Sequence, residues 1–328
     1  MSISILVPCF NEELVIKDFY DEVTSILVNN NLDFELVFIN DGSTDGTLNI
    51  LKKIASKDKR VQYVSFSRNF GKESAMLAGL SYCRGLAVVI MDADLQHPPS
   101  LIPEMIKNYE SGYDQVIAKR NRKGESQVRS IISKLYYKVM NKLVDIELVD
   151  GIGDFRLLSR RAVDALLALN ENNRFSKGLF SWIGFNEYII EYDNVNREVG
   201  TSKWSFPKLL NYGIDGVISF NNKPLRISIY IGTFVTIIDI LYVIFTLFQI
   251  IVTGVQVPGY FTTIAIVSLI GGIQLIFLGI IGEYIGRIYY EAKSRPHYIV
   301  QETNCNELKQ DTNETLSSQS MYIKVNSF

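Results

Sequence analysis

The chain has 328 residues, which is more than one minimal domain needs and allows a sizeable core together with a second part. Its formal net charge of −2 gives no sign of a nucleic-acid partner, and none is expected. Cys9, Cys83 and Cys305 are odd in number and far apart, which fits neither a disulfide framework nor a zinc-ligand spacing and favours a reducing compartment. The first apolar run stops at Pro8 and has no basic segment before it, so we expect no signal peptide and a cytosolic N-terminal part.

The first 120 residues alternate short β-rich runs with helical stretches. The predicted strands are residues 4–7, 34–39, 61–65, 86–91 and 115–118, and the predicted helices are residues 12–27, 44–56, 72–83 and 99–110. Apolar runs of this length suit strands buried on both faces of a parallel sheet, and the alternation implies right-handed crossovers. The sequence therefore predicts a doubly wound α/β domain, whose ligands bind beyond the carboxyl ends of the strands.

Polar clusters follow three of the predicted strands, at residues 8–12, 40–46 and 92–96. Because the carboxyl ends of parallel strands share one edge of the sheet, these clusters should converge there. The middle cluster is also compatible with a plain tight turn and helix cap, since Asp, Gly, Ser and Thr favour such positions.

Asp92 and Asp94 lie one residue apart at the end of an apolar strand. Two carboxylates so close repel each other unless a cation sits between them or one is protonated. Mg²⁺ and Mn²⁺ prefer oxygen ligands and are often held by one or two carboxylates plus substrate phosphates. The pair therefore predicts a metal that neutralises a diphosphate leaving group, with a solvated, helix-capping turn as the alternative.

Two long apolar stretches near the C-terminus predict a membrane hairpin. Residues 227–253 carry a single charge, Asp239, and residues 260–282 carry none, so each exceeds the roughly 20 apolar residues needed to cross a bilayer. Basic residues flank only the outer ends of the pair: Lys223, Arg226, Arg287, Lys293 and Arg295. By the positive-inside rule both flanks are cytosolic, and two buried helices of a soluble protein are the alternative. Asp239 suggests a polar partner in a neighbouring subunit, so a homo-oligomer is a further hypothesis.

The segments around the hairpin complete the predicted organisation. Residues 205–226 have helix-like apolar spacing and either lie in the membrane interface or pack on the soluble domain. Residues 283–300 form a juxtamembrane segment with tyrosine anchors, and the polar residues 301–328 are expected to be a disordered tail.

Five motifs together resemble glycosyltransferase family 2, most closely the polyprenyl-phosphate sugar transferases. They are residues 8–12, 40–43, 92–96, 153–156 and 197–204, and the likeness extends through the hairpin to about residue 300. The resemblance implies a GT-A fold for residues 1–204. It also implies that Asp41 binds the nucleobase, that Asp92 faces the nucleotide, and that Asp94 and Gln96 hold Mg²⁺ or Mn²⁺. The rest of the base and ribose pocket would be formed by Pro8, Asn11 and Glu12. A lid over the diphosphate would be formed by Arg197, Ser202 and Lys203. Without the resemblance, residues 197–204 are equally compatible with an ordinary exposed loop.

An acceptor whose nucleophile is a phosphate needs cations. Arg120, Arg122, Arg129 and Ser133 supply donors for it, although basic residues near a membrane also attract anionic lipid headgroups. Asp154 is the candidate catalytic carboxylate. A phosphate monoester is mostly ionised at neutral pH, so Asp154 has three open roles: proton acceptor, orienting group, or partner of Arg156.

The expected activity is the inverting, metal-dependent transfer of a sugar from a nucleotide-sugar to a polyprenyl phosphate. It would take place at the cytosolic face of the plasma membrane and supply a lipid-linked sugar for the cell envelope, with both termini cytosolic. UDP-glucose is the first expectation, and GDP-mannose and UDP-N-acetylglucosamine are alternatives. A polysaccharide synthase and a non-catalytic nucleotide-binding scaffold are the other possibilities, but the former normally has more spans, and Asp92, Asp94 and Asp154 argue against the latter.

Overall fold

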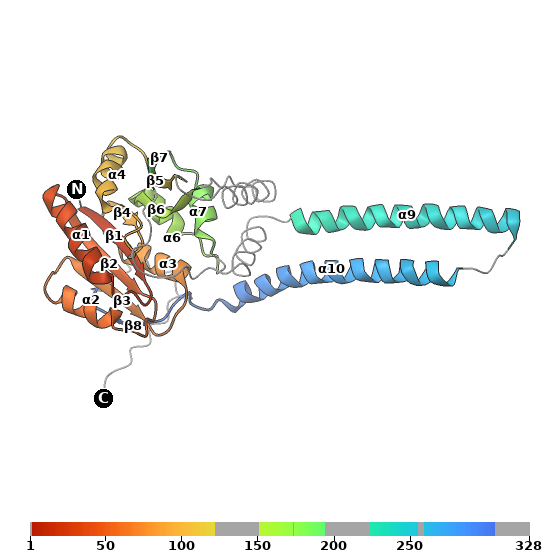
Figure 1. Cartoon of the computed structure of the whole chain (residues 1–328), viewed down its shortest axis with the longest axis horizontal. Helices are drawn as coiled ribbons and strands as arrows, with labels where there is room; N and C mark the ends of the chain where they lie inside the picture. Colours follow the sequence, from red (N-terminus) through yellow and green to blue (C-terminus); the bar gives the residue numbers. More distant parts are fainter. Residues whose placement is uncertain (1, 122–150, 173, 194–222, 255–258, 306–328) are drawn as a thin grey trace, which may run out of the picture.

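The computed structural model describes residues 2–121, 151–172, 174–193, 223–254 and 259–305. An α/β domain carries two long helices that project from it side by side (Figure 1). The strands are β1 (Ser2–Cys9), β2 (Asp33–Asn40), β3 (Val61–Phe66), β4 (Ala87–Ile90), β5 (Gln115–Arg120), β6 (Ile152–Ser159), β7 (Glu187–Tyr192) and β8 (Val300–Thr303). The helices are α1 (Ile16–Asn29), α2 (Thr47–Ala55), α3 (Lys72–Tyr82), α4 (Ile102–Glu110), α6 (Arg160–Leu167), α7 (Ser176–Trp182), α9 (Lys223–Thr253) and α10 (Tyr260–Lys293), with a 3-10 turn η1 (Pro99–Leu101) before α4.

All described strands belong to one sheet, in the order β7-β5-β6-β4-β1-β2-β3-β8. The pairs β3–β2, β2–β1 and β1–β4 are parallel, which confirms the predicted parallel core. Chain order runs outward in both directions from β1 and β4, so the switch point at which such sheets bind ligands lies between these two strands.

The sheet is mixed rather than purely parallel, which corrects the simpler sequence prediction. β6 is inserted between β4 and β5 and runs antiparallel to both, and β8 runs antiparallel to β3. All five predicted strands are present, and so are the four predicted helices, although the first begins at Ile16 rather than residue 12. Strands and helices alternate around one central sheet, so the predicted α/β fold class is confirmed.

Alternate residues of the central strands supply the core on the two faces of the sheet. Ile3, Ile5 and Val7 pack with α1, α2 and α4 on one face, whereas Leu6 packs with α3, α6 and α7 on the other. Burying one such aliphatic side chain contributes about 1.5–3 kcal/mol. Continuous burial on both faces thus stabilises the central strands and fixes where their carboxyl ends lie.

Helix α3 lies unusually close to β1. A Cβ atom at Gly79 would lie 1.8 Å from Leu6 Cδ1, so a larger residue at this position would force the buried Leu6 side chain to move. The close packing holds the first residue of α3, Lys72, at the carboxyl edge of the sheet.

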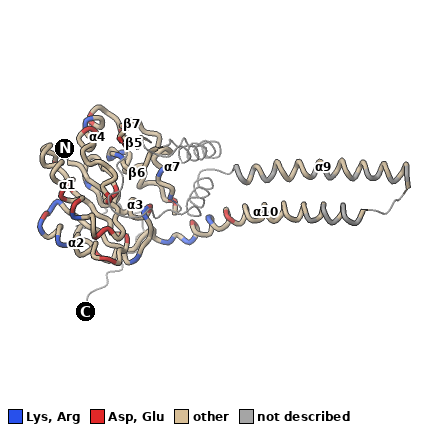
Figure 2. The backbone as a smooth tube through the Cα atoms, viewed as in Figure 1, with Lys and Arg blue, Asp and Glu red and all other residues tan. Residues whose placement is uncertain are grey.

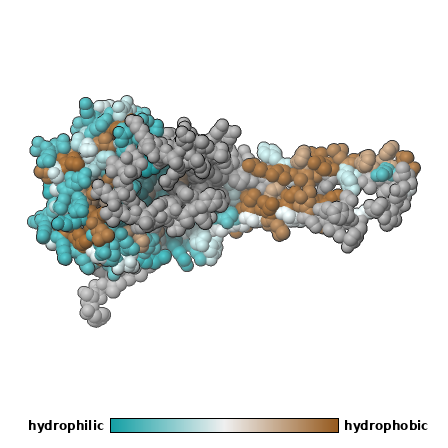
Figure 3. All heavy atoms as spheres, in the orientation of Figure 1, coloured by the Kyte–Doolittle hydropathy of each residue, from teal (hydrophilic) through white to brown (hydrophobic). Residues whose placement is uncertain are grey.

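Helices α9 and α10 form an antiparallel pair that projects from the α/β domain (Figure 1). An added Cβ at Gly232 of α9 would lie 3.9 Å from the Phe277 ring of α10, so the two helices are in contact. Their described surface is largely apolar (Figure 3), whereas charged residues gather on the α/β domain and the adjoining end of α10 (Figure 2). The stretch Leu269–Lys293 is long and apolar enough to cross a membrane by length and composition. The predicted spans, residues 227–253 and 260–282, lie within α9 and α10.

The chain returns to the α/β domain directly after α10. Tyr298 stacks on Phe66 with ring centroids 4.9 Å apart, and β8 then pairs with β3. The Asn304 side chain accepts from Tyr63 N at 2.6 Å and donates to Val61 O at 3.1 Å. Residues 301–305 are therefore part of the domain and not of a disordered tail as predicted, because pairing with β3 satisfies their backbone groups. Residues 306–328, and residues 205–222 of the predicted interfacial helix, lie outside the described part of the chain, and residues 223–226 belong to α9.

Candidate functional site

The register between β4 and β6 brings two of the predicted aspartates together. Ile90 at the end of β4 lies opposite Arg156 of β6 in this antiparallel pair. Two residues beyond Ile90 therefore lie beside two residues before Arg156. These are Asp92 and Asp154, so the two carboxylates meet at the carboxyl edge of β4.

Lys72, the first residue of α3, bridges the two carboxylates. Its Nζ lies 2.7 Å from Asp92 Oδ1 and 2.7 Å from Asp154 Oδ2. The Asp154 side chain is 14% exposed, that of Asp92 is 32% exposed and that of Lys72 is 42% exposed. The ion pairs are thus open to solvent on the lysine side, where a substrate can enter.

Electrostatics at this bridge favour the charged form of each group. Burial lowers the pKa of the Lys72 ammonium, but the charges of Asp154 and Asp92 outweigh burial and raise that pKa above its usual range. Burial raises the pKa of Asp154, but Lys72 and Lys177 outweigh it and hold that pKa well below its usual range. Asp154 is therefore a weak base in this arrangement, which favours an orienting role over proton abstraction.

Asp154 forms its ion pair with Lys72 rather than with Arg156. The Arg156 guanidinium donates to Gly153 O at 2.9 Å and lies over the Phe180 ring, 3.8 Å from its centroid. Arg156 therefore connects β6 with α7. Pairing with Arg156 was one of three roles considered for Asp154, and in the structure the charge of Arg156 only lowers the pKa of Asp154.

The turn after β4 is held by its own polar groups. Asp94 Oδ1 accepts from Gln96 N at 3.2 Å, and Leu95 adopts a left-handed backbone with φ 57°. Asp92 N donates to His97 Nδ1 at 3.0 Å, and the His97 ring stacks on Phe155 at 4.8 Å. Burial lowers the pKa of His97, which keeps the accepting nitrogen unprotonated.

Asp92, Asp94 and Gln96 present carboxylate and amide oxygens on this turn. No cluster of three or more His, Cys, Asp or Glu side chains suited to a metal occurs within the described residues. One or two carboxylates with a few oxygens left to substrate phosphates is the usual way in which proteins bind Mg²⁺ at phosphate sites. The donor set therefore fits a divalent cation bound together with a diphosphate, and does not fit a metal held by protein side chains alone.

The predicted nucleotide side is built from two interlocked loops. Asn11, in a left-handed conformation with φ 55°, donates from its backbone N to Ser43 Oγ at 2.9 Å and accepts from Thr44 N at 2.9 Å. Glu12 N donates to Thr47 Oγ1 at 2.9 Å. These contacts bring the loop after β1 and the loop after β2 together at the edge where Asp92 lies.

Asp41 is buried just beyond β2 and is already engaged. Its two carboxylate oxygens accept from Phe70 N at 2.6 Å and Gly71 N at 2.9 Å. Burial raises the pKa of Asp41, and these two backbone hydrogen bonds oppose that rise. Each oxygen keeps a second lone pair, so a base-binding role stays a prediction beside the visible one of fixing the loop before α3.

The remaining predicted residues divide into described and undescribed ones. Pro8 is half-buried on β1, and Arg120 is exposed at the carboxyl end of β5, on the same edge as Asp92. Six predicted residues lie outside the described part of the chain: Arg122, Arg129, Ser133, Arg197, Ser202 and Lys203.

Sequence reasoning missed Lys72, Glu73, His97 and Lys177. Lys72 and Glu73 follow the loop after β3, at the same edge as the three clusters that were recognised. Applying the carboxyl-edge rule to the third strand would have identified Lys72. Lys177 had no such signal, because α7 reaches the site only through tertiary packing.

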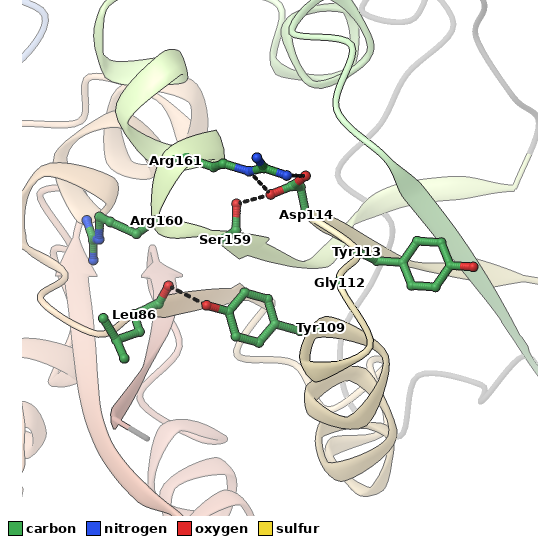
Figure 4. Close-up of a pocket in the computed structure, with 8 residues that line it drawn as sticks. All are labelled: Leu86, Tyr109, Gly112, Tyr113, Asp114, Ser159, Arg160 and Arg161. Carbon is green, nitrogen blue, oxygen red and sulfur yellow. Dashed lines mark hydrogen bonds and ion pairs between the residues drawn. The ribbon is translucent and has the colours of Figure 1, made fainter.

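A shallow depression of about 310 Å³ lies at the opposite edge of the sheet (Figure 4). Asp114 there accepts from Ser159 Oγ at 2.8 Å and from the Arg161 guanidinium, and Tyr109 approaches Leu86 O. These contacts join the amino ends of β4 and β5 to α6, so they support the sheet far from the Asp92 edge.

Both parts of the chain have counterparts among known proteins. Residues 4–167 match the family described as glycosyl transferase family 2, and residues 223–288 match the one described as the GtrB C-terminal hairpin. A Bacillus subtilis (strain 168) protein, named provisionally as the glycosyltransferase CsbB, is 57% identical over 316 residues and 96% of each chain. The bactoprenol glucosyl transferase of Shigella phage SfX is 42% identical over 302 residues, which cover 92% of this chain and 99% of the relative.

Among solved structures, a glucosyl-3-phosphoglycerate synthase from Mycobacterium tuberculosis is similar with a TM-score of 0.44 and 22% identity. That crystal structure contains Mn²⁺, UDP-glucose and phosphoglyceric acid, and the match covers 66% of this chain and 77% of that chain.

Proposed function

The chain belongs to glycosyl transferase family 2, and from this premise we propose that it transfers glucose from UDP-glucose to the phosphate of a polyprenyl phosphate at a membrane. One combination carries the proposal: a glycosyltransferase domain, with Asp92 and Asp154 at the carboxyl edge of its sheet, is joined to an apolar hairpin. A lipid-linked acceptor stays at the bilayer, where an enzyme held by an apolar hairpin can reach it. The relative from phage SfX, whose name assigns a bactoprenol acceptor and glucose, supports the choice of lipid and sugar.

The donor side of the site follows from the residues at the carboxyl edge. Asp94 and Gln96 would hold Mg²⁺ or Mn²⁺, which supplies charge neutralisation for the departing diphosphate. Lys72 adds a positive charge beside Asp92, where the diphosphate would lie. Asp41, Asn11 and Glu12 would bind the base and ribose.

The acceptor side places less demand on base catalysis. The acceptor phosphate has a second pKa of about 6 and is mostly ionised at neutral pH. Lys72 holds Asp154 in its charged form. Asp154 would in turn position Lys72 beside the acceptor phosphate, and it would not remove the proton of that phosphate. Direct attack at the anomeric carbon without a covalent enzyme intermediate inverts the configuration there. The acceptor phosphate would be bound by Arg120 together with Arg122, Arg129 and Ser133.

Transfer to lipid is tested with purified membranes that contain the full chain, polyprenyl phosphate and a panel of radiolabelled nucleotide-sugars. We expect label from UDP-glucose to enter the organic phase and to do so only with a divalent cation present. GDP-mannose and UDP-N-acetylglucosamine are the comparison donors, and preferential transfer from either would change the sugar assignment.

The matched variant is Asp94→Ala, which removes a proposed metal ligand from a half-buried turn beyond the end of β4. We expect transfer to fall by about 100-fold or more. Unchanged turnover by this variant would contradict the catalytic assignment of the edge.

A further inference from the structure

The segment between α6 and α7 is bonded to the hairpin at one end. Asn172 N donates to Glu291 Oε1 at 2.8 Å, and Asn172 Nδ2 donates to Glu291 Oε2 at 2.9 Å. Glu291 belongs to the last turn of α10, close to the point where the chain returns to the domain. One carboxylate of the hairpin therefore holds both a backbone and a side-chain donor of the α/β domain.

The other end of this segment is bonded to α3, next to the catalytic edge. Glu73 Oε2 accepts from Ser176 N at 3.1 Å and also from Ser176 Oγ, so both bonds end on a single oxygen. Between the two ends, the Arg174 guanidinium donates to Leu169 O at 2.6 Å and Leu166 O at 3.1 Å, which fastens the segment to the end of α6. Asn172 thus contacts α10, and Ser176 contacts the first turn of α3.

Glu73 is the neighbour of Lys72, and its surroundings are charged. Burial raises the pKa of Glu73 to about 7. The charge of Asp154 also raises this pKa, and the charge of Lys72 lowers it. The charge of Glu73 in turn raises the pKa of Arg174. A carboxyl withdrawn even partly from water is costly unless it is hydrogen-bonded, and Ser176 supplies two bonds to the half-buried Glu73. Loss of those bonds would leave Glu73 without its fixed partner and release the turn that carries Lys72.

Helix α7 closes the connection on the side of β6. Phe180 packs under Arg156, Phe180 O accepts from Gln115 Nε2 at 2.9 Å, and the charge of Lys177 lowers the pKa of Asp154. The beginning of α7 is therefore tied to Lys72 through Glu73, and the rest of α7 is tied to Asp154 through β6. Both partners of the ion pair depend on where α7 lies.

We propose that Glu73 is a positioning residue for sugar transfer, which holds Lys72 over Asp92 and Asp154 only while Asn172 is docked on Glu291 of the membrane hairpin. Attachment of the domain to the hairpin thereby orders the ion-paired edge. This inference rests on the proposed transferase activity and adds two residues, Glu73 and Glu291, that act through Lys72 and do not touch the substrates. A displacement of about 1 Å at a reacting edge is enough to change a rate by about 100-fold, so a contact outside the edge can have a large effect.

The first test compares Glu73→Ala with Glu73→Gln in the full chain. The alanine variant loses the acceptor for Ser176, and we expect kcat to fall by about 10- to 100-fold with a change of less than about threefold in KM for the donor. The glutamine variant keeps one carbonyl oxygen that accepts both bonds, and we expect it to restore kcat to within about threefold of the original chain. Glu104→Ala, which removes an exposed acidic residue from the first turn of α4, is the matched control for loss of a helix-terminal charge.

The second test examines the connection to the hairpin without using activity. Glu291→Ala should increase amide hydrogen exchange in residues 174–182 and in residues 70–76, whereas Glu283→Ala, at an exposed position of the same helix, should not. The double variant Glu73→Ala/Glu291→Ala should have nearly the same kcat as Glu73→Ala alone, because both changes interrupt one connection.

The outcomes separate this inference from the proposed function. The positioning role would be wrong if the original chain transfers sugar and the two substitutions have additive effects on kcat. It would also be wrong if amide exchange is unaltered in Glu291→Ala. Either result leaves the transferase assignment intact. No transfer by the original chain, with exchange still linked between α10 and α3, would overturn the transferase assignment instead. A defect in Glu73→Gln equal to that in Glu73→Ala would also overturn the hydrogen-bond explanation.

Discussion

Lys72 carries the positive charge that allows Asp92 and Asp154 to face one edge of the sheet together. Two neighbouring carboxylates otherwise repel, and one of them takes up a proton. The 2.7 Å contacts of Lys72 Nζ with both aspartates reduce that repulsion. Among the neighbouring charges, that of Lys72 lowers the pKa of Asp154 most, and Lys177 and Arg156 add to the effect.

Replacing Lys72 with methionine keeps the length of the side chain and removes its charge. Without Lys72, the largest charge that opposes burial is lost and the pKa of Asp154 rises, so Asp154 becomes protonated at higher pH than in the original chain. We expect kcat/KM at pH 7 to fall by about 100-fold and the acidic limb of its pH profile to move to higher pH.

Lys72→Arg is the control, since it keeps the charge and should leave the acidic limb in place. The measurement is transfer to lipid between pH 5 and pH 9. An acidic limb that stays unmoved in Lys72→Met would show that Asp154 does not depend on this ion pair.

At the scale of elements, the site depends on how loops pack on one another. Gly42 follows β2 with φ +63°, and a Cβ atom there would lie 2.2 Å from the backbone carbon of Arg68. The loop after β2 and the loop after β3 therefore touch through their backbones, which places Asp41 where Phe70 N and Gly71 N can donate to it.

Substitution of Gly42 with alanine should separate these two loops. We expect lower thermal stability and a raised KM for the nucleotide-sugar, by about tenfold, because Asp41 loses its alignment with the loop before α3. Gly112→Ala is the matched control: its φ of +101° is also unfavourable for alanine, but no atom lies within 4 Å of the added Cβ. Gly112→Ala should lose stability and keep its KM, and an equal rise of KM in both variants would contradict the loop-packing argument.

The aspartates after β4 could be predicted from the sequence, whereas strands β6 and β8 could not. Asp92 and Asp94 were found because they directly follow a buried parallel strand, whose carboxyl end has a known role in such sheets. β6 was not found, because Gly153 and Asp154 directly follow its first residue, Ile152, and its place between β4 and β5 is decided by pairing across distant parts of the chain. β8 alternates half-buried and exposed residues and becomes a strand only by pairing with β3.

At the scale of the whole molecule, the hairpin is bound at its returning end. Only residues 294–299 separate α10 from β8, and β8 is part of the sheet. If the hairpin crosses a bilayer, as we propose, the adjoining end of α10 lies on the same side as the α/β domain. With 34 residues, α10 is about 50 Å long, and α9 with 31 residues is about 46 Å long, so each exceeds the roughly 30 Å hydrocarbon core.

We expect the turn between α9 and α10 to lie across the membrane from the α/β domain, and single cysteines can test this. The three native cysteines are buried and should give little background labelling. Gly259→Cys is at the exposed start of α10, and Arg295→Cys is at an exposed position just after its end. In sealed vesicles with the domain facing outward, an impermeant maleimide should label Arg295→Cys at once and Gly259→Cys only after permeabilisation, because a spanning pair of helices puts these positions on opposite sides. Labelling of both cysteines in intact vesicles would mean that the pair lies along one face of the membrane, and the proposed two-span arrangement would be wrong.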